Sequence, residues 1–270
     1  MNPRAVPVLF GAICLGALLI RRGVRWRLPS ADLLTEFFTY GFWVYIGNMG
    51  ATFSQRIDQY FVKQVSVAPG AFGVYNLATS LTNRTRIFPQ ALSRSAYARL
   101  CSSELREAAE LTAACFRQML ALGILLCAIG SLAAPLIPFI YSAEFAAAVL
   151  PFIIFLFGKL FQNCSWMLAN FFSGHLARPR TPMLVNWLLL PLQGAGAYFA
   201  MLWGGLIAVA IIASLGYALQ FLVFLILFLR AQPHVGLSRL FLIGKDDITP
   251  WQRLLKRTPP SPRSSSSSSS

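Results

Sequence analysis

Charged residues are scarce in this chain of 270 residues. They make up 12% of the sequence, and hydrophobic residues make up 56%, whereas soluble domains contain about 25% charged and about 45 to 50% apolar residues. Acids are the rarest charged type, because nine Asp and Glu stand against 23 Lys and Arg and leave a formal net charge of +14. This composition excludes an ordinary soluble protein and leaves nucleic acid, an anionic membrane or an acidic substrate as partners.

Residues that commonly catalyse reactions or bind metals are also few. The chain has two histidines, His175 and His234, and its five cysteines show no Cys-x-x-Cys spacing. A catalytic or metal site needs several such groups close together, and the sequence shows no such set. We therefore predict no enzymatic activity, no cofactor and no metal site.

Long apolar stretches are abundant, and a stretch of about 17 to 25 apolar residues can cross a bilayer. The candidate spans are 6–20, 37–65, 71–92, 119–140, 145–172, 183–203 and 206–229. We predict an all-α integral membrane protein with about seven transmembrane helices.

Four parts are expected along the chain. The first is a helix with a basic linker (1–35), and the second is a six-helix transmembrane lobe (36–230). A basic tail along the membrane interface (231–258) follows, for which a solvated tail is the alternative. The last part is a disordered Pro/Ser-rich end (259–270).

Basic residues divide the loops between these spans into two kinds. Seventeen of the 23 Lys and Arg residues lie in alternate loops and in the C-terminal tail, and the loops near Ala68, Ser142 and Gly204 carry none. Because Lys and Arg in short loops stay on the cytoplasmic side, we predict a cytoplasmic C-terminus and an outer N-terminus. The scatter also argues against nucleic acid, which is bound by a basic patch with interleaved aromatic residues.

Six cations remain, and most of them lie inside predicted spans: Arg4, Arg56, Lys63, Arg84, Arg86 and Lys159. A charge at the bilayer centre costs about 2.5 to 3.5 kcal/mol on insertion scales, and such residues usually face a bundle interior or an aqueous cavity. Counted at about 1.5 Å per residue from the span ends, Arg84, Arg86 and Lys159 are expected near the midplane and Arg56 towards the outer side. These four residues are the candidates for binding an anion in a cavity.

Polar residues recur near these cations at the three- and four-residue steps of one helix face. The expected accessory lining is Asn48, Gln55, Asp58, Asn76, Asn83 and Asn163. Asp58 lies about 200° around the helix from Arg56, so we expect it to meet a neighbouring helix. The alternative for the amides is hydrogen bonding between helices that holds a bundle together without any ligand.

The order of several motifs resembles a known family. Residues 37–230 contain Arg56-Ile57-Asp58, Ala68-Pro69-Gly70-Ala71-Phe72-Gly73, Phe88-Pro89-Gln90-Ala91-Leu92 and Trp203-Gly204-Gly205-Leu206. This pattern is similar to the C-terminal six-helix lobe of polysaccharide-export flippases, the O-antigen type transporters of the multidrug/oligosaccharidyl-lipid/polysaccharide exporter superfamily. The resemblance covers about 190 residues.

The resemblance implies two lobes of helices around a central cavity in a bacterial cytoplasmic (inner) membrane. Such a transporter moves polyprenyl-pyrophosphate-linked oligosaccharide outwards for synthesis of surface polysaccharide such as lipopolysaccharide. Arg84, Arg86, Lys159 and Arg56 would then bind the pyrophosphate. Because one helix alone precedes the second lobe, we expect a truncated or half-size form that assembles with a separate N-terminal lobe or with a second copy of itself, among membrane lipids.

Two other functions remain open at this point. A multidrug or metabolite exporter of the same superfamily would favour carboxylates inside the membrane for cation coupling, and Asp58 alone is available. The other alternative is a membrane enzyme or a non-catalytic helical bundle of glycan assembly.

Overall fold

The computed structural model describes residues 30–65 and 69–241, and these residues form helices and no β-strand. The chain divides into two compact units, Met1–Phe42 and Trp43–Ser270. In the first unit the described residues are Ser30 and the start of helix α2 (Ala31–Ser54). Ser30 caps this helix, since its Oγ accepts a hydrogen bond from the Leu33 N–H at 3.3 Å, as is common at helix N-termini. The predicted span 6–20 lies outside the described residues.

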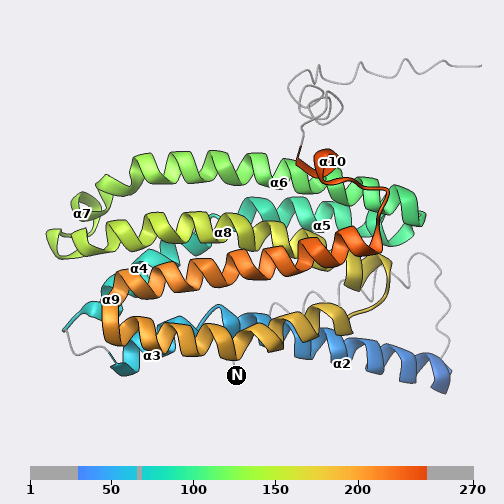
Figure 1. Cartoon of the computed structure of the whole chain (residues 1–270), viewed down its shortest axis with the longest axis horizontal. Coiled ribbons are helices and arrows are strands. Elements are labelled where there is room, and N and C mark those ends of the chain that lie inside the picture. Colours follow the sequence, from blue (N-terminus) through green and yellow to red (C-terminus); the bar gives the residue numbers. More distant parts are fainter. Residues whose placement is uncertain (1–29, 66–68, 242–270) are drawn as a thin grey trace, which may run out of the picture. The chain divides into compact units, whose positions relative to one another are not determined.

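The second unit contains the end of α2 and all later helices (Figure 1). These are α3 (Ile57–Val65), α4 (Ala71–Arg84), α5 (Ile87–Ser102), α6 (Leu105–Ala133), η1 (Ala134–Leu136), α7 (Ile137–Ile140), η2 (Ala143–Ala148), α8 (Val149–Asn170), the π-helical turn η3 (Phe171–His175), α9 (Arg180–Ala231) and α10 (Leu237–Phe241).

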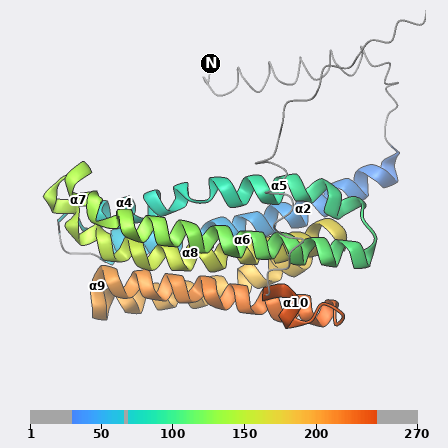
Figure 2. The same cartoon turned by 90° about the horizontal axis from the view of Figure 1, so that it is seen from above.

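Helix α8 is the centre of this unit. It packs against α6, against α4 and α5, and against α9, and Figure 2 shows α4 and α5 on the side of α8 opposite α9. Within the described part of the basic tail, residues 231–241, α10 packs on α6. Leu240 of α10 is fully buried, and the Phe241 ring meets the Phe116 ring edge to face at 5.5 Å.

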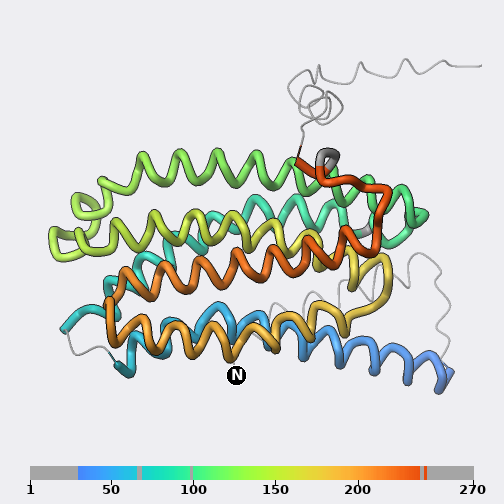
Figure 3. The backbone as a smooth tube through the Cα atoms, in the orientation of Figure 1, coloured from blue at the N-terminus to red at the C-terminus, as the bar shows by residue number. Residues whose placement is uncertain are grey.

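Three helical stretches within 30–65 and 69–241 are long and apolar enough to cross a membrane: Leu105–Ile140, Ala143–His175 and Arg180–Ala231. The third is a hairpin, and Figure 3 shows the backbone turning back within α9. At the turn Gly205 has φ 62° and ψ −152°, a conformation open essentially to glycine alone. Each half is about 37 Å long at 1.5 Å per residue, so each half can cross the hydrocarbon core. This break agrees with the predicted separate spans 183–203 and 206–229.

The predicted spans 37–65 and 71–92 are not single continuous helices, because each is interrupted once. One break lies at Gln55 and Arg56 and the other at Thr85 and Arg86. At both breaks the backbone hydrogen bonds shorten to three residues: Arg56 N to Phe53 O at 3.0 Å and Thr85 N to Thr82 O at 3.2 Å. The Thr85 hydroxyl also donates to Thr82 O at 2.7 Å, and such side-chain bonds compete with the helical pattern. Neither segment is among the three stretches that could cross a membrane.

Two apolar clusters lie at the two ends of α8. One contains Phe155 and Leu156 with Tyr75 and Val209, and the other contains Leu168 and residues of α6 and the second half of α9. The polar residues of α8 lie between the two clusters in the sequence of that helix. The fold therefore holds a polar layer between two apolar layers.

Candidate functional site

The polar layer on α8 consists of side chains that are almost completely shielded. Lys159 is 4% exposed, Gln162 2% and Asn163 3%. A buried charge or amide is costly unless it is paired, so the partners of these side chains decide what the layer can do. We refer to Asp58, Lys159, Gln162 and Asn163 as the buried polar layer.

Lys159 has its partners within the protein. Its Nζ donates a hydrogen bond to Gln162 Oε1 at 2.8 Å, and it lies 4.8 Å from the centre of the Tyr217 ring. A ring face attracts an ammonium group, most strongly where water is excluded. These contacts are thus with the protein, and Lys159 is not among the residues that line the pocket described below.

Asp58 is the buried carboxylate of the layer, with 3% of its surface exposed. It accepts hydrogen bonds from the Tyr75 hydroxyl at 2.7 Å and from the Gln59 N–H at 2.8 Å. Tyr75 belongs to α4, so the prediction that Asp58 meets a neighbouring helix is confirmed. Arg56, two residues earlier, is exposed.

Arg86 lies at the break between α4 and α5 and makes two contacts that cross to other helices. Its Nη1 donates to Gln55 Oε1 at 2.6 Å, and its guanidinium carbon lies 4.1 Å above the Trp166 ring. Its Nε is buried and has no hydrogen-bond partner among the described residues, as is also true of Asn83 Oδ1, Asn163 Oδ1 and Gln193 Nε2. Unpaired buried polar atoms are uncommon in native proteins and mark sites that merit a functional explanation.

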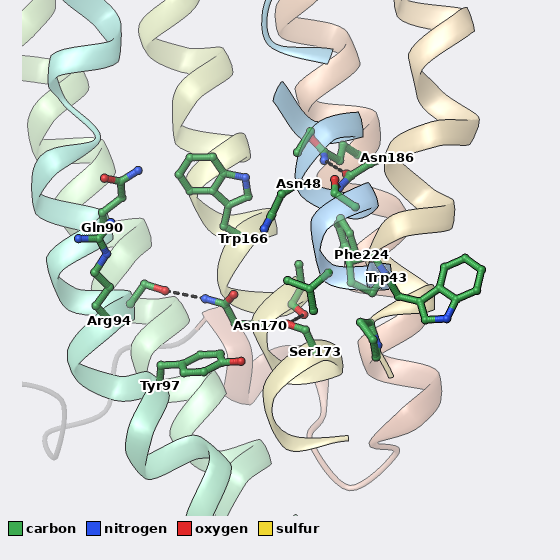
Figure 4. Close-up of a pocket in the computed structure, with 18 of the residues that line it drawn as sticks. Trp43, Asn48, Gln90, Arg94, Tyr97, Trp166, Asn170, Ser173, Asn186 and Phe224 are labelled. Carbon is green, nitrogen blue, oxygen red and sulfur yellow. Dashed lines mark hydrogen bonds between the residues drawn. The ribbon is translucent and has the colours of Figure 1, made fainter. Parts of the chain in front are cut away.

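A pocket of about 420 Å³ opens beside Arg86. Its walls come from the last residues of α2, from α5, from α8 with η3, and from both halves of α9 (Figure 4). Arg86 and Arg94 are the charged residues of the lining, and no acid is among the residues that line it. The pocket is therefore cationic.

One face of α5 forms a wall of this pocket. Arg86, Gln90, Arg94 and Tyr97 follow one another at steps of four, four and three residues, so they share one helix face. Figure 4 shows Gln90, Arg94 and Tyr97 in a row that faces Trp166, Asn170 and Ser173. This face brings two guanidinium groups to one cavity.

The other walls carry amide and aromatic side chains. Asn170 Nδ2 donates to Ser93 Oγ at 2.6 Å and ties α8 to α5. Asn186 Nδ2 donates to Gly47 O at 3.2 Å, and Asn186 Oδ1 accepts a hydrogen bond from Gln220 Nε2 at 2.7 Å. Few precisely placed polar groups among aromatic and apolar ones are typical of a small-molecule site.

The sequence-predicted residues fall into three places. Arg86 and Asn48 line the pocket. Lys159, Asp58 and Asn163 lie in the buried polar layer, and none of the three lines the pocket. Arg84, Arg56 and Asn76 are exposed, Asn83 and Gln55 are half-buried, and Gln55 bonds to Arg86.

Sequence reasoning missed Arg94, Trp166, Asn186 and Gln220 as lining residues. Arg94 is one of the seventeen basic residues that are assigned from the sequence to loops and to the tail. The signal for a different role is its spacing, because it follows Arg86 and Gln90 at four-residue steps. No comparable signal marks Trp166 or Asn186, since their exposure to the pocket depends on how α8 and α9 pack.

No group of three or more His, Cys, Asp or Glu side chains that could hold a metal occurs within residues 30–65 and 69–241. Comparison of the chain with protein-family models, with curated proteins and with solved structures finds no match. The functional argument therefore rests on the chemistry of the pocket.

Proposed function

We propose that this protein is a membrane transporter of an anionic, lipid-linked glycan. The substrate class that we infer is polyprenyl-pyrophosphate-linked oligosaccharide, moved across a bacterial cytoplasmic membrane for synthesis of surface polysaccharide. The observation that carries the proposal is the pocket of about 420 Å³, which two arginines and no acidic residue line. The sequence resemblance to polysaccharide-export flippases supports the same function.

Guanidinium groups suit a pyrophosphate for physical reasons. The planar fork of an arginine donates two parallel hydrogen bonds to phosphate oxygens, and a cleft with low-dielectric walls strengthens the attraction. Tyr97 at the end of the α5 wall, and Asn170 and Asn186 on the facing walls, offer a ring face and amides of the kind that bind sugars. The pocket thus has one surface for the anion and others for a glycan.

The orientation of the chain supports export from the cytoplasm. The pocket lies at the end of the helices where Arg94 lines its wall and Pro179 lies between Arg178 and Arg180. By the positive-inside rule this end faces the cytoplasm. The pocket would then receive its ligand from the cytoplasmic side.

Two exposed polar stripes support a further helical partner. Asn48, Thr52 and Arg56 are exposed along α2 and the break after it, and Asn76, Ser80 and Arg84 are exposed along α4. Charged and polar groups facing lipid are costly, so we infer that another helical lobe or a second copy covers these stripes. In that assembly Arg56 and Arg84 would face the cavity between the two lobes.

The test is translocation of a fluorescent polyprenyl-pyrophosphate oligosaccharide in proteoliposomes, measured by the fraction that an impermeant quencher reaches. We expect Arg86→Ala to reduce the rate about 100-fold, because removing a partly buried anion-binding cation costs several kcal/mol. The matched control is Arg106→Ala, which removes an exposed arginine paired with Glu110 on the same helix at 3.6 Å. Equal rates for the two variants would contradict the proposal.

One observation favours the exporter alternative, namely the buried carboxylate Asp58. An exporter coupled to a cation would lose transport in Asp58→Asn, and transport of cationic drugs would be the measured activity. The cationic lining of the pocket disfavours such substrates.

A further inference from the structure

The two broken helices are joined to each other at their breaks. Gln55 belongs to the break between α2 and α3, Arg86 belongs to the break between α4 and α5, and a hydrogen bond of 2.6 Å joins their side chains. Helices at membrane depth are usually broken only where the freed groups are buried in protein or line a cavity. The hydrogen bond therefore brings the two breaks together at one place beside the pocket.

The Arg86 side chain lies next to two regions of α8: Trp166, over whose ring it stacks, and the buried polar layer one turn earlier on that helix. Arg86 and Trp166 line the pocket. In the buried polar layer, Asn163 precedes Trp166 by one helical turn and is 3% exposed. The stacked pair of Arg86 and Trp166, held by Gln55, therefore forms the floor of the pocket.

We propose that Gln55 is a positioning residue that keeps this floor closed, and that a phosphate-bearing ligand opens it by drawing Arg86 away from Gln55. Gln55 offers a neutral amide oxygen, whereas a phosphate offers charged oxygens that form hydrogen bonds about twice as strong. Arg86 Nε is buried and has no partner among the described residues, so a phosphate that draws Arg86 into the pocket can pair with both Nε and Nη1 in place of Gln55. Opening joins the pocket to Lys159, the next cation inside the bundle. This inference depends on the proposed function for the identity of the ligand.

Accessibility of a cysteine in the polar layer tests the proposal. The variant Asn163→Cys is labelled with an impermeant maleimide in the full-length protein in nanodiscs, and the protein without this substitution gives the background from native cysteines. Lys63→Cys, at an exposed position of α3 that does not line the pocket, is the control that should react at the same rate in every variant. Gln162→Cys supplies a second position in the layer if Asn163→Cys lowers the yield of folded protein.

The expected result is a slow reaction of Asn163→Cys when Gln55 is intact. Adding Gln55→Ala should raise the labelling rate about tenfold, because loss of a hydrogen bond to a charged group shifts an opening equilibrium by that order. Inorganic pyrophosphate should raise the rate in the protein with Gln55 intact. Gln55→Glu, whose carboxylate pairs with Arg86 more strongly, should suppress the effect of pyrophosphate.

Unchanged protection of Asn163→Cys in folded Gln55→Ala protein would overturn the proposal. Opening by Gln55→Ala without any effect of pyrophosphate would overturn its ligand-driven step. If both labelling effects are observed but the protein does not translocate the glycan, the proposed function is contradicted. The proposal of a closed floor is then still supported.

Discussion

Arg86 and Lys159 make the clearest comparison within the molecule. Both are cations that sequence analysis placed near the membrane midplane, and both contact an aromatic ring. Lys159 is sealed among Gln162 and Tyr217, whereas Arg86 borders a pocket and keeps an unpaired Nε among the described residues. The difference teaches that a charge within a bundle identifies a ligand site only when its side chain borders open space.

The largest expected effect concerns the sealed cation. Lys159→Met leaves Gln162 Oε1, a buried acceptor, without its donor, and an unpaired buried polar atom costs about 1 to 3 kcal/mol. We expect a clearly lower unfolding temperature in detergent. The pyrophosphate affinity should stay within about twofold, because Lys159 does not line the pocket; a tenfold change would correspond to about 1.4 kcal/mol of binding free energy. Lys63→Met, at an exposed lysine of α3, is the control, and a large loss of affinity in Lys159→Met would erase the distinction.

The second largest effect concerns pyrophosphate binding and distinguishes Arg94 from Arg84, two arginines outside the buried polar layer. Arg94 lines the pocket and Arg84 does not. Arg94→Gln should weaken pyrophosphate binding about tenfold, because it removes charge-assisted hydrogen bonds to the ligand, while Arg84→Gln should leave it unchanged. Isothermal titration calorimetry of both variants measures this difference, and the reverse order would place the anion on the exposed stripe of α4.

The smallest effect concerns the ring beneath Arg86. A cation–π contact contributes about 0.5 to 2 kcal/mol, so Trp166→Phe should weaken pyrophosphate binding only a fewfold. The same variant should lose the change in tryptophan fluorescence that pyrophosphate causes. Trp203→Phe, at a side chain that is 88% exposed, should keep that change; if it removes the signal instead, Trp166 does not report on the site.

Several features of the fold follow from local sequence. The hairpin of α9 is predictable, because two apolar runs flank Gly204-Gly205 and glycine alone fits the turn at Gly205. The breaks between α2 and α3 and between α4 and α5 are not predictable in this way, because Gln55-Arg56 and Thr85-Arg86 carry neither glycine nor proline. Those breaks depend on side-chain hydrogen bonds and on contacts with α8 and α9.

The candidate site is less predictable than the fold, for a geometric reason. Arg84 and Arg86 are two residues apart, about 200° around a helix, and the break between them changes the phase of the helix once more. Sequence reasoning could therefore predict a similar depth for both without telling which one faces the pocket. Sequence reasoning misses Arg94 because the positive-inside rule already explains a cation in a predicted loop. The sequence alone does not separate that role from a role in lining the pocket.

The most direct test of the central claim is a distance between bound phosphorus and protein nitrogen. Solid-state NMR on the protein in bilayers, with ¹⁵N in the arginine or the lysine side chains, detects ³¹P–¹⁵N dipolar coupling to added pyrophosphate. We predict coupling to arginine guanidinium nitrogens that is largely lost in Arg86→Gln, and none to lysine Nζ. Coupling to lysine, or arginine coupling that survives Arg86→Gln and Arg94→Gln together, would contradict a pyrophosphate site in this pocket.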